Sequence, residues 1–287
     1  MLGGPPQPTL RDLWTPEDEE DVHLFLEAVS RADLLAALSA IEGSPAADRL
    51  EDEAQVTAWA AVTARRLPLL PSRGPFALSR LLRGLLVDDL SFRGDSDDYS
   101  ATRNCCIHRV LARRKGMPIL LSSIWIEVGR RAGIPVDGIG MPGHFLVRVG
   151  GSVGVHVDPF AGGQELSREG CRALHDRIAG PKSRWSDDFL EVSTTDQILE
   201  RVLNNLAAST REERDAAGSY RVATFLAALR PLSPERTLQK AMTAAAIGVT
   251  DEAATAFADV IERFPDSPEA ERASQGLDSL SAGTPVN

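Results

Sequence analysis

Cysteines, long apolar runs and basic charge are all scarce in this chain of 287 residues, and each shortage excludes a class of protein. Its three cysteines, two of them adjacent, cannot form a disulfide framework, so we expect a protein of the reducing cytoplasm. No stretch approaches about 18 uninterrupted apolar residues, which excludes a membrane span, and the first residues lack the features of a secretory leader. A net charge of −10 makes nucleic acid an unsuitable partner.

Two strand-like segments, residues 144–149 and 153–158, flank a Gly-Gly-Ser loop and predict a β-hairpin. A three-residue loop gives one wholly apolar face, with the pairs Phe145–Val157, Val147–Val155 and Val149–Val153. The other face then carries the pairs His144–Asp158, Leu146–His156 and Arg148–Gly154. Facing Cβ atoms lie roughly 4.5–5.5 Å apart. We therefore expect the carboxylate of Asp158 to reach the ring of His144, as in sites where an Asp fixes the tautomer of a catalytic His.

A buried helix is predicted upstream of this hairpin. Residues 119–131 repeat apolar side chains at helical spacing, and Gly133-Ile134-Pro135 would end the helix. Pro118 suits the first turn, where a missing N–H costs nothing. Such a helix start would stabilise a thiolate through its free N–H groups and dipole, but neither Pro118 nor its apolar neighbours offers a thiol.

In this order of motifs the chain resembles the transglutaminase-like superfamily. That pattern has Gly-x-Cys at the start of a core helix, Gly-Ile-Pro after it, a His beginning the next strand and Asp-Pro on the following strand. The matching positions are Gly116, Gly133-Ile134-Pro135, His144 and Asp158-Pro159, and the Cys of the pattern falls on Pro118.

The resemblance is most specific to the SirB-type members of that superfamily. The block Pro-Gly-His-Phe-Leu-Val-Arg over residues 142–148 and the Asp-Pro-Phe that begins at Asp158 carry this likeness, which covers roughly residues 80–280. Many such proteins have Pro at the position of the nucleophile, followed by a tetratricopeptide tail. The resemblance implies a fold and a domain order, but it implies no established reaction.

Two other cysteines could replace the missing nucleophile. Cys105 and Cys106 follow Asn104, an expected N-cap, at the start of a predicted helix over residues 105–114. A thiol in that first turn could act as a nucleophile facing the His of the hairpin. Alternatively, both cysteines are small core residues, because free Cys is among the most buried residue types.

No metal or cofactor site is expected. Cys105, Cys106 and His108 lie too close together in sequence to converge on one ion, and no C-x-x-C or H-E-x-x-H motif occurs. His23 and His175 lie in charged helical segments and are expected at the surface.

The polar face of the hairpin offers two further candidates. Arg148 and His156 are predicted to share that face with His144 and Asp158, where they could contact a substrate. The alternative for His156 is a polar residue at the rim of the sheet, without a ligand.

The C-terminal part carries a repeat. Pro-Leu-Ser-Pro-Glu at residues 231–235 recurs as Pro-Asp-Ser-Pro-Glu at 265–269, and this offset of 34 residues is the tetratricopeptide period. Helices are predicted over residues 198–208, 218–229, 235–247 and 251–264. Helix pairs of this kind stack because one pair cannot bury its apolar face alone. They usually bind a protein or peptide; the alternative is that they only cap the core.

These patterns predict an α+β protein with four regions. They are a flexible arm (1–15), a helical N-terminal subdomain (16–100), a transglutaminase- or papain-like core with a small antiparallel sheet (101–190), and a tail of tetratricopeptide-like helical hairpins (191–287).

Three functions fit this architecture. The first is a non-catalytic scaffold with a regulatory role, binding a protein or peptide through its tail and through a cleft that bears His144 and Asp158. The second is a cysteine-dependent acyltransferase or amidohydrolase, in which Cys105 or Cys106 attacks, His144 is the base and Asp158 orients it. In the third, His144 and Asp158 act alone as an acid–base pair of a hydrolase.

Overall fold

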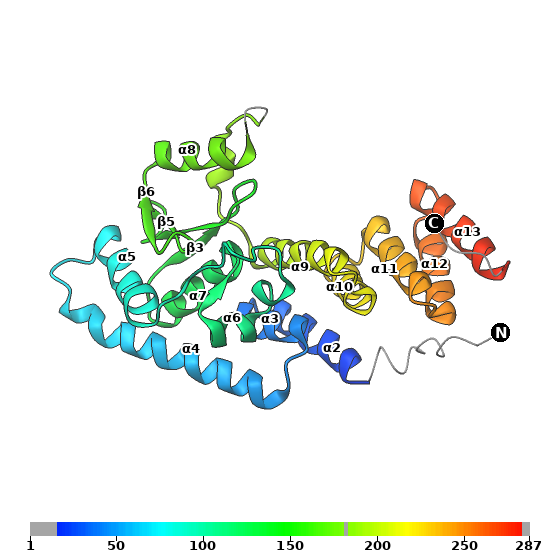
Figure 1. Ribbon diagram of the computed structural model, residues 1–287, viewed down its shortest axis with the longest axis horizontal. Helices are drawn as coiled ribbons and strands as arrows, with labels where there is room; N and C mark the ends of the chain where they lie inside the picture. Colours follow the sequence, from blue (N-terminus) through cyan, green and yellow to red (C-terminus); the bar gives the residue numbers. More distant parts are fainter. Residues whose placement is uncertain (1–15, 181–182, 283–287) are drawn as a thin grey trace. The chain divides into compact units, whose positions relative to one another are not determined.

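The computed structural model describes residues 16–180 and 183–282, so the predicted arm at residues 1–15 lies outside the described residues. The chain divides into two compact units. One comprises Ala28–Val202, and the other joins the described part of Met1–Glu27 to that of Leu203–Asn287. The predicted α+β class is confirmed: helices dominate, and the larger unit contains a small antiparallel sheet (Figure 1).

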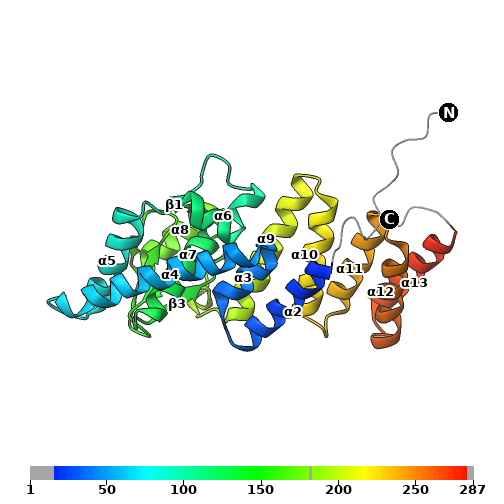
Figure 2. The same cartoon turned by 90° about the horizontal axis from the view of Figure 1, so that it is seen from below.

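Helices build most of the larger unit, because its amphipathic segments recur with capping residues between them. They are α3 (Leu34–Glu42), α4 (Ala46–Arg66), α5 (Pro75–Arg83) with a π-helical turn (Gly84–Asp89), α6 (Ile107–Arg113) and α7 (Pro118–Arg131). The N-cap of α3 is Asp33, whose carboxylate accepts a bond from the Ala36 N–H (3.1 Å). The apolar stripe of α7, including Leu120 and Val128, is fully buried, and α4 packs along α7 (Figure 2).

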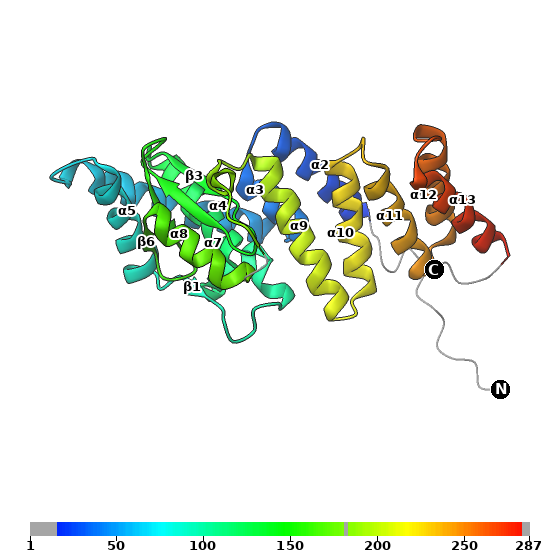
Figure 3. The same cartoon turned by 90° about the horizontal axis from the view of Figure 1, so that it is seen from above.

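The sheet has four antiparallel strands in chain order. They are β3 (Val136–Ile139), β4 (Leu146–Val149), β5 (Val155–Asp158) and β6 (Gln164–Leu166). One face packs on α7, while the other lies under α8 (Arg168–Ala179), where Leu146 meets Cys171 and Leu174 (Figure 3). A separate parallel pair, β1 (Arg93–Gly94) and β2 (Lys115–Gly116), lies beside the start of α7.

The predicted register of the β4–β5 hairpin is wrong by two residues. Val147 pairs with Val157 and Val149 with Val155, because the loop is five residues long, from Gly150 to Gly154. Gly150 and Gly151 adopt positive φ angles of 99° and 80°, which glycine tolerates, and so start the longer turn. A shift of two residues keeps each side chain on its predicted face. Val153, however, is 86% exposed at the loop instead of facing Val149.

The predicted helix start at Cys105 is also wrong. The helix α6 begins at Ile107, and Cys106 occupies its N-cap position without a side-chain capping bond. Asn104 ends a short 3-10 turn, where its buried side chain donates to the Asp98 carbonyl oxygen (2.6 Å) and accepts from Arg113 Nη1 (2.9 Å). These tertiary bonds use the side chain that we expected to cap the helix.

One of the two histidines expected at the surface is buried. His175 has no exposed surface, whereas His23 is exposed as predicted. The ring of His175 bonds to Asp176 (3.1 Å) and Ser183 (3.0 Å) and stacks near Phe189. The apolar face of α8 therefore includes a histidine whose two nitrogens are both satisfied.

The second unit is helical. It includes most of α2 (Pro16–Ser30), the later part of α9 (Thr195–Glu212), α10 (Ala216–Leu229), α11 (Pro234–Ala246), α12 (Thr250–Arg263) and α13 (Pro268–Ser281). From α10 to α13 each helix packs on the next (Figure 3). Ser233 and Ser267 cap α11 and α13 alike, accepting bonds from the N–H groups of Arg236 and Ala270. This shared cap accounts for the 34-residue repeat; that these hairpins are tetratricopeptide repeats stays a prediction.

None of the helices in the described ranges combines the length and the apolar character needed to cross a bilayer.

Candidate functional site

His144 and Asp158 meet at one edge of the sheet. His144 lies in the turn before β4, and its Nε2–H donates to Oδ2 of Asp158, the last residue of β5 (2.9 Å). The second carboxylate oxygen, Oδ1, accepts the backbone N–H groups of Phe160 (3.0 Å) and Ala161 (3.2 Å). The two residues are only 7% and 4% exposed. With Nε2 as the donor, the second ring nitrogen is Nδ1, which has no hydrogen bond to any described residue.

The turn that presents His144 is held by Arg201 of α9. Arg201 Nη2 donates to the carbonyl oxygens of Met141 (2.7 Å) and His144 (2.8 Å), and its guanidinium lies over the ring of Phe145 (5.5 Å). Burial lowers the pKa of Arg201. Sequence reasoning missed this residue, because no motif marks it. Its one signal is a charged residue inside the apolar stripe of α9, between Ile198 and Val202.

Pro118 is the first residue of α7, and Cys105 lies close to it. The N–H of Met117 donates to the Asn104 carbonyl oxygen (3.1 Å), and Cys105 Sγ lies 2.8 Å from Met117 Sδ. Cys105 and Cys106 are 2% and 8% exposed. The structure therefore brings Cys105 to the start of α7, whereas Cys106 lies at the start of α6.

Aromatic rings connect this region to the His–Asp pair. The ring of Phe160 makes edge contacts with His144 (6.0 Å) and with Tyr99 (5.9 Å). Partial burial raises the pKa of Tyr99, and the positive charge of Arg201 acts in the opposite direction. Phe160 thus connects the dyad to Tyr99, whose carbonyl oxygen accepts from Asn104, the residue before Cys105.

The remaining histidine and cysteine near the core are engaged elsewhere. His108 Nδ1–H donates to Asp52 Oδ1 (3.0 Å), so this ring turns towards α4. Cys171 is fully buried under the sheet; burial, and then the charge of Asp158, raise its pKa to about 11. Its thiol is therefore protonated at neutral pH and is not a nucleophile. No three His, Cys, Asp or Glu side chains gather as a metal site within the described ranges.

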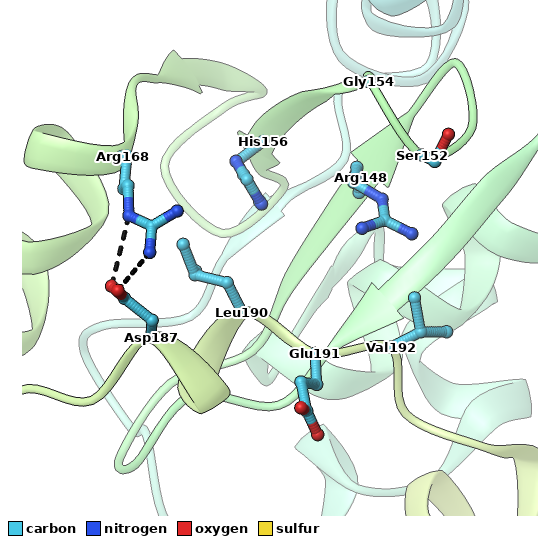
Figure 4. A pocket seen from close by; sticks show the side chains of 9 residues that line it. All are labelled: Arg148, Ser152, Gly154, His156, Arg168, Asp187, Leu190, Glu191 and Val192. Atoms are coloured by element: carbon cyan, nitrogen blue, oxygen red, sulfur yellow. Dashed lines mark hydrogen bonds and ion pairs between the residues drawn. The ribbon is translucent and has the colours of Figure 1, made fainter.

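Arg148 and His156 line a pocket of about 610 Å³ on the α8 side of the sheet. They are direct cross-strand partners, and Figure 4 shows both side chains directed into the pocket. The pocket is completed by Ser152, Gly154, Arg168, Asp187, Leu190, Glu191 and Val192. The two predicted substrate contacts thus lie together, two residues along β5 from Asp158.

A second hollow lies in the helical unit. It has a volume of about 510 Å³ and is lined by α9, α11 and α13. Three arginines, Arg211, Arg236 and Arg272, border it, and Leu238 and Met242 form part of its wall. Arg211 and Arg272 form no ion pair with any described residue, although acidic residues outnumber basic ones in the chain.

Comparison with known proteins identifies relatives of the chain. The family model of the transglutaminase-like superfamily matches residues 50–204. The UPF0162 protein of Xylella fastidiosa (strain 9a5c) is 34% identical over 190 residues, which are 63% of this chain and 66% of that protein. UPF0162 protein PA3419 of Pseudomonas aeruginosa is 32% identical over 68% of this chain and 65% of its own length.

A more distant relative is protein SirB1 of Salmonella typhimurium, which is 21% identical over 67% of this chain and 71% of that protein. The chain spans a little less than two thirds of the length of the two UPF0162 proteins. No solved structure matches it.

Proposed function

The chain belongs to the transglutaminase-like superfamily, and we propose that it is a non-catalytic scaffold of that superfamily. It binds a protein or peptide partner through the sheet face that bears His144 and Asp158 and through the C-terminal helices. One observation carries the proposal: Pro118 begins α7, where the superfamily pattern has its nucleophilic Cys. Residues of a catalytic triad act as a unit, so loss of the nucleophile removes nearly all turnover.

The environment of the remaining dyad supports a structural role. Both oxygens of Asp158 and the Nε2 of His144 are bonded within the fold, and both side chains are almost fully buried. Hydrogen bonds between buried polar groups favour one arrangement of a core. The dyad then holds the turn before β4 against the end of β5. Cys105, Cys106 and Cys171 form no disulfide, which suits the reducing cytoplasm.

The hollow beside α11 supports binding of an acidic peptide segment. Some other arginines of the same unit are paired, as Arg263 is with Asp259 and Arg221 with Asp21. Arg211 and Arg272 instead line the hollow without an ion pair among the described residues, so basic side chains outnumber the one acidic side chain there, Glu235. Opposite charge across an interface favours encounter and selects the partner.

Thiol reactivity tests the non-catalytic assignment. The protein and its His144→Ala variant are treated with iodoacetamide from pH 6 to pH 9, and modification of Cys105 and Cys106 is followed by mass spectrometry. We expect both thiols to stay unmodified until the protein unfolds. Fast alkylation near pH 7 that slows in His144→Ala would reveal a working Cys–His pair and refute the proposal.

Peptide binding tests the scaffold. A fluorescein-labelled hexaglutamate peptide should bind the protein, as measured by fluorescence anisotropy, and binding should weaken with salt. Arg211→Ala and Arg272→Ala should each weaken binding about tenfold, as expected for the loss of a charge-assisted bond. Arg214→Ala removes the same charge outside the hollow and serves as the matched control. Equal weakening by all three variants would show that only net charge matters.

A second candidate function is a cysteine-dependent acyltransferase or amidohydrolase. The observation that favours it is the position of Cys105, whose Sγ lies against Met117 at the start of α7. His144 would take the thiol proton through Nδ1, and backbone N–H groups at the helix start would stabilise the oxyanion. In the alkylation experiment this candidate requires Cys105→Ser to abolish the fast, His144-dependent reaction.

A further inference from the structure

The pocket between the β4–β5 hairpin and residues 187–192 contains two buried nitrogens that the fold leaves unsatisfied. Arg148 Nε and His156 Nε2 have no hydrogen-bond partner in the described part of the chain. Because the two residues are direct partners across β4 and β5, both nitrogens belong to one cavity. Arg148 Nε is a donor, and His156 Nε2 is one in the tautomer that carries its proton there. A buried donor without an acceptor is unfavourable, so the two nitrogens point to a missing acceptor.

The charged groups around the pocket hold these donors in place. Arg148 Nη2 donates to Asp137 Oδ2 (2.9 Å), and Arg168 pairs with Asp187 at the rim. Burial, and then the charges of Arg148 and Arg168, lower the pKa of His156. The imidazole is therefore neutral near pH 7, with one N–H to donate. The fixed guanidinium of Arg148 and this N–H suit an anionic oxygen.

The other walls of the pocket determine which group can be attached to the anionic oxygen of a ligand. Leu190 and Val192 provide an apolar side, and Val192 is 44% exposed. Glu191 brings a carboxylate to the lining, but Figure 4 shows it turned away from Arg148 and His156. The volume of about 610 Å³ lies in the range of small-molecule sites.

We propose that this pocket binds a small ligand that carries a carboxylate or phosphate group on a short apolar chain. The anionic oxygens accept from Arg148 Nε and His156 Nε2, and the chain lies against Leu190 and Val192. The site is separate from the basic hollow of the helical unit, so it does not depend on the partner proposed for that unit. Binding of a ligand in this pocket also requires no cysteine thiol.

Binding is tested on the full chain with three probes: butyrate, its neutral isostere butyramide, and inorganic phosphate. The ring nitrogens of ¹⁵N-labelled histidine report on His156, with the signal assigned through His156→Gln. We expect butyrate or phosphate to shift the His156 signal with a dissociation constant on the order of 1 mM, and butyramide to bind at least about tenfold more weakly. The tighter of the two anions identifies the group recognised.

Two variants locate the site. Arg148→Met should weaken anion binding about tenfold or more, whereas Arg177→Met removes the same charge from an exposed position on α8 and should have no effect. Arg148→Lys keeps a cation for Asp137 but lacks the Nε donor, so it should also bind weakly if Arg148→Met fails to fold. The proposal is overturned if neither anion shifts the His156 signal, or if Arg148→Lys and Arg177→Met bind as the unaltered chain does.

Discussion

One face of the β4–β5 hairpin carries two polar pairs that differ in how fully the fold satisfies them. The pair His144–Asp158 is nearly buried, and Asp158 accepts three bonds, two of them from backbone N–H groups. The pair Arg148–His156 borders a pocket, and each side chain retains an unbonded nitrogen. The closed pair, His144–Asp158, keeps only one unbonded nitrogen, His144 Nδ1. The open pair, Arg148–His156, keeps two beside a pocket and so has more capacity for a ligand.

The largest effect should follow loss of the closed pair. Asp158→Ala leaves His144 and two backbone N–H groups without their acceptor, so we expect the free energy of unfolding to fall by about 3 kcal/mol. Urea denaturation near pH 7 measures this change. Asp158→Asn keeps an acceptor oxygen, so its free energy of unfolding should fall by less than that of Asp158→Ala. A loss below about 1 kcal/mol for Asp158→Ala would mean that the dyad does not organise this edge of the sheet.

Loss of Arg201 should have the second-largest effect on stability, because Arg201 holds the same turn from outside the sheet. In Arg201→Met the carbonyl oxygens of Met141 and His144 lose a charged donor, and we expect a loss of about 2 kcal/mol. The control is Arg211→Met, at an exposed position of the same helix. If the two variants lose the same stability in urea, the bonds of Arg201 contribute nothing specific.

The open pair should matter less for stability. Arg148→Met removes an unsatisfied nitrogen together with a partly exposed ion pair to Asp137, so we expect a loss of about 1 kcal/mol or less. The comparison with Asp158→Ala is made under the same urea conditions. A loss as large as that of Asp158→Ala would remove the distinction between the two pairs.

Sequence reasoning reached the closed pair and the class of fold, but not the details that depend on tertiary contacts. The contact of His144 with Asp158 was predicted from a register that placed them opposite each other. The register is different, and they meet instead from the turn before β4 and the end of β5. The loop length between β4 and β5 depends on where the glycine turn closes, and the apolar alternation is unchanged by a shift of two residues, so the register was missed.

Other errors arose from contacts between distant segments. Arg201 follows His144 by 57 residues, and no local pattern connects the two. The burial of His175 was detectable, because it lies one and four residues after Leu174 and Cys171 on the apolar face of α8. The charged residues around it concealed this periodicity.

A third polar pair, His108–Asp52, gives the smallest predicted effect and tests whether burial explains how strongly such a pair stabilises the fold. His108 and Asp52 join α6 to α4, but His108 is 30% exposed and Asp52 Oδ2 has no hydrogen-bond partner among the described residues. Burial acts against the charge of His108, but the bond and charge of Asp52, with Asp48 and Glu42, outweigh it and raise its pKa above 6.5.

A raised pKa in the folded state stabilises the fold below the pKa of the unfolded state, and this contribution disappears as pH rises through the folded value. Burial also raises the pKa of Asp52, which changes stability in the same direction. His108→Gln should therefore lower the free energy of unfolding by a few tenths to about 1 kcal/mol at pH 5.5, and by less at pH 8.5. Urea denaturation at both pH values measures the difference. If the loss is instead larger at pH 8.5, the neutral ring supports the contact between α4 and α6, and exposure would not explain why this pair is weaker than His144–Asp158.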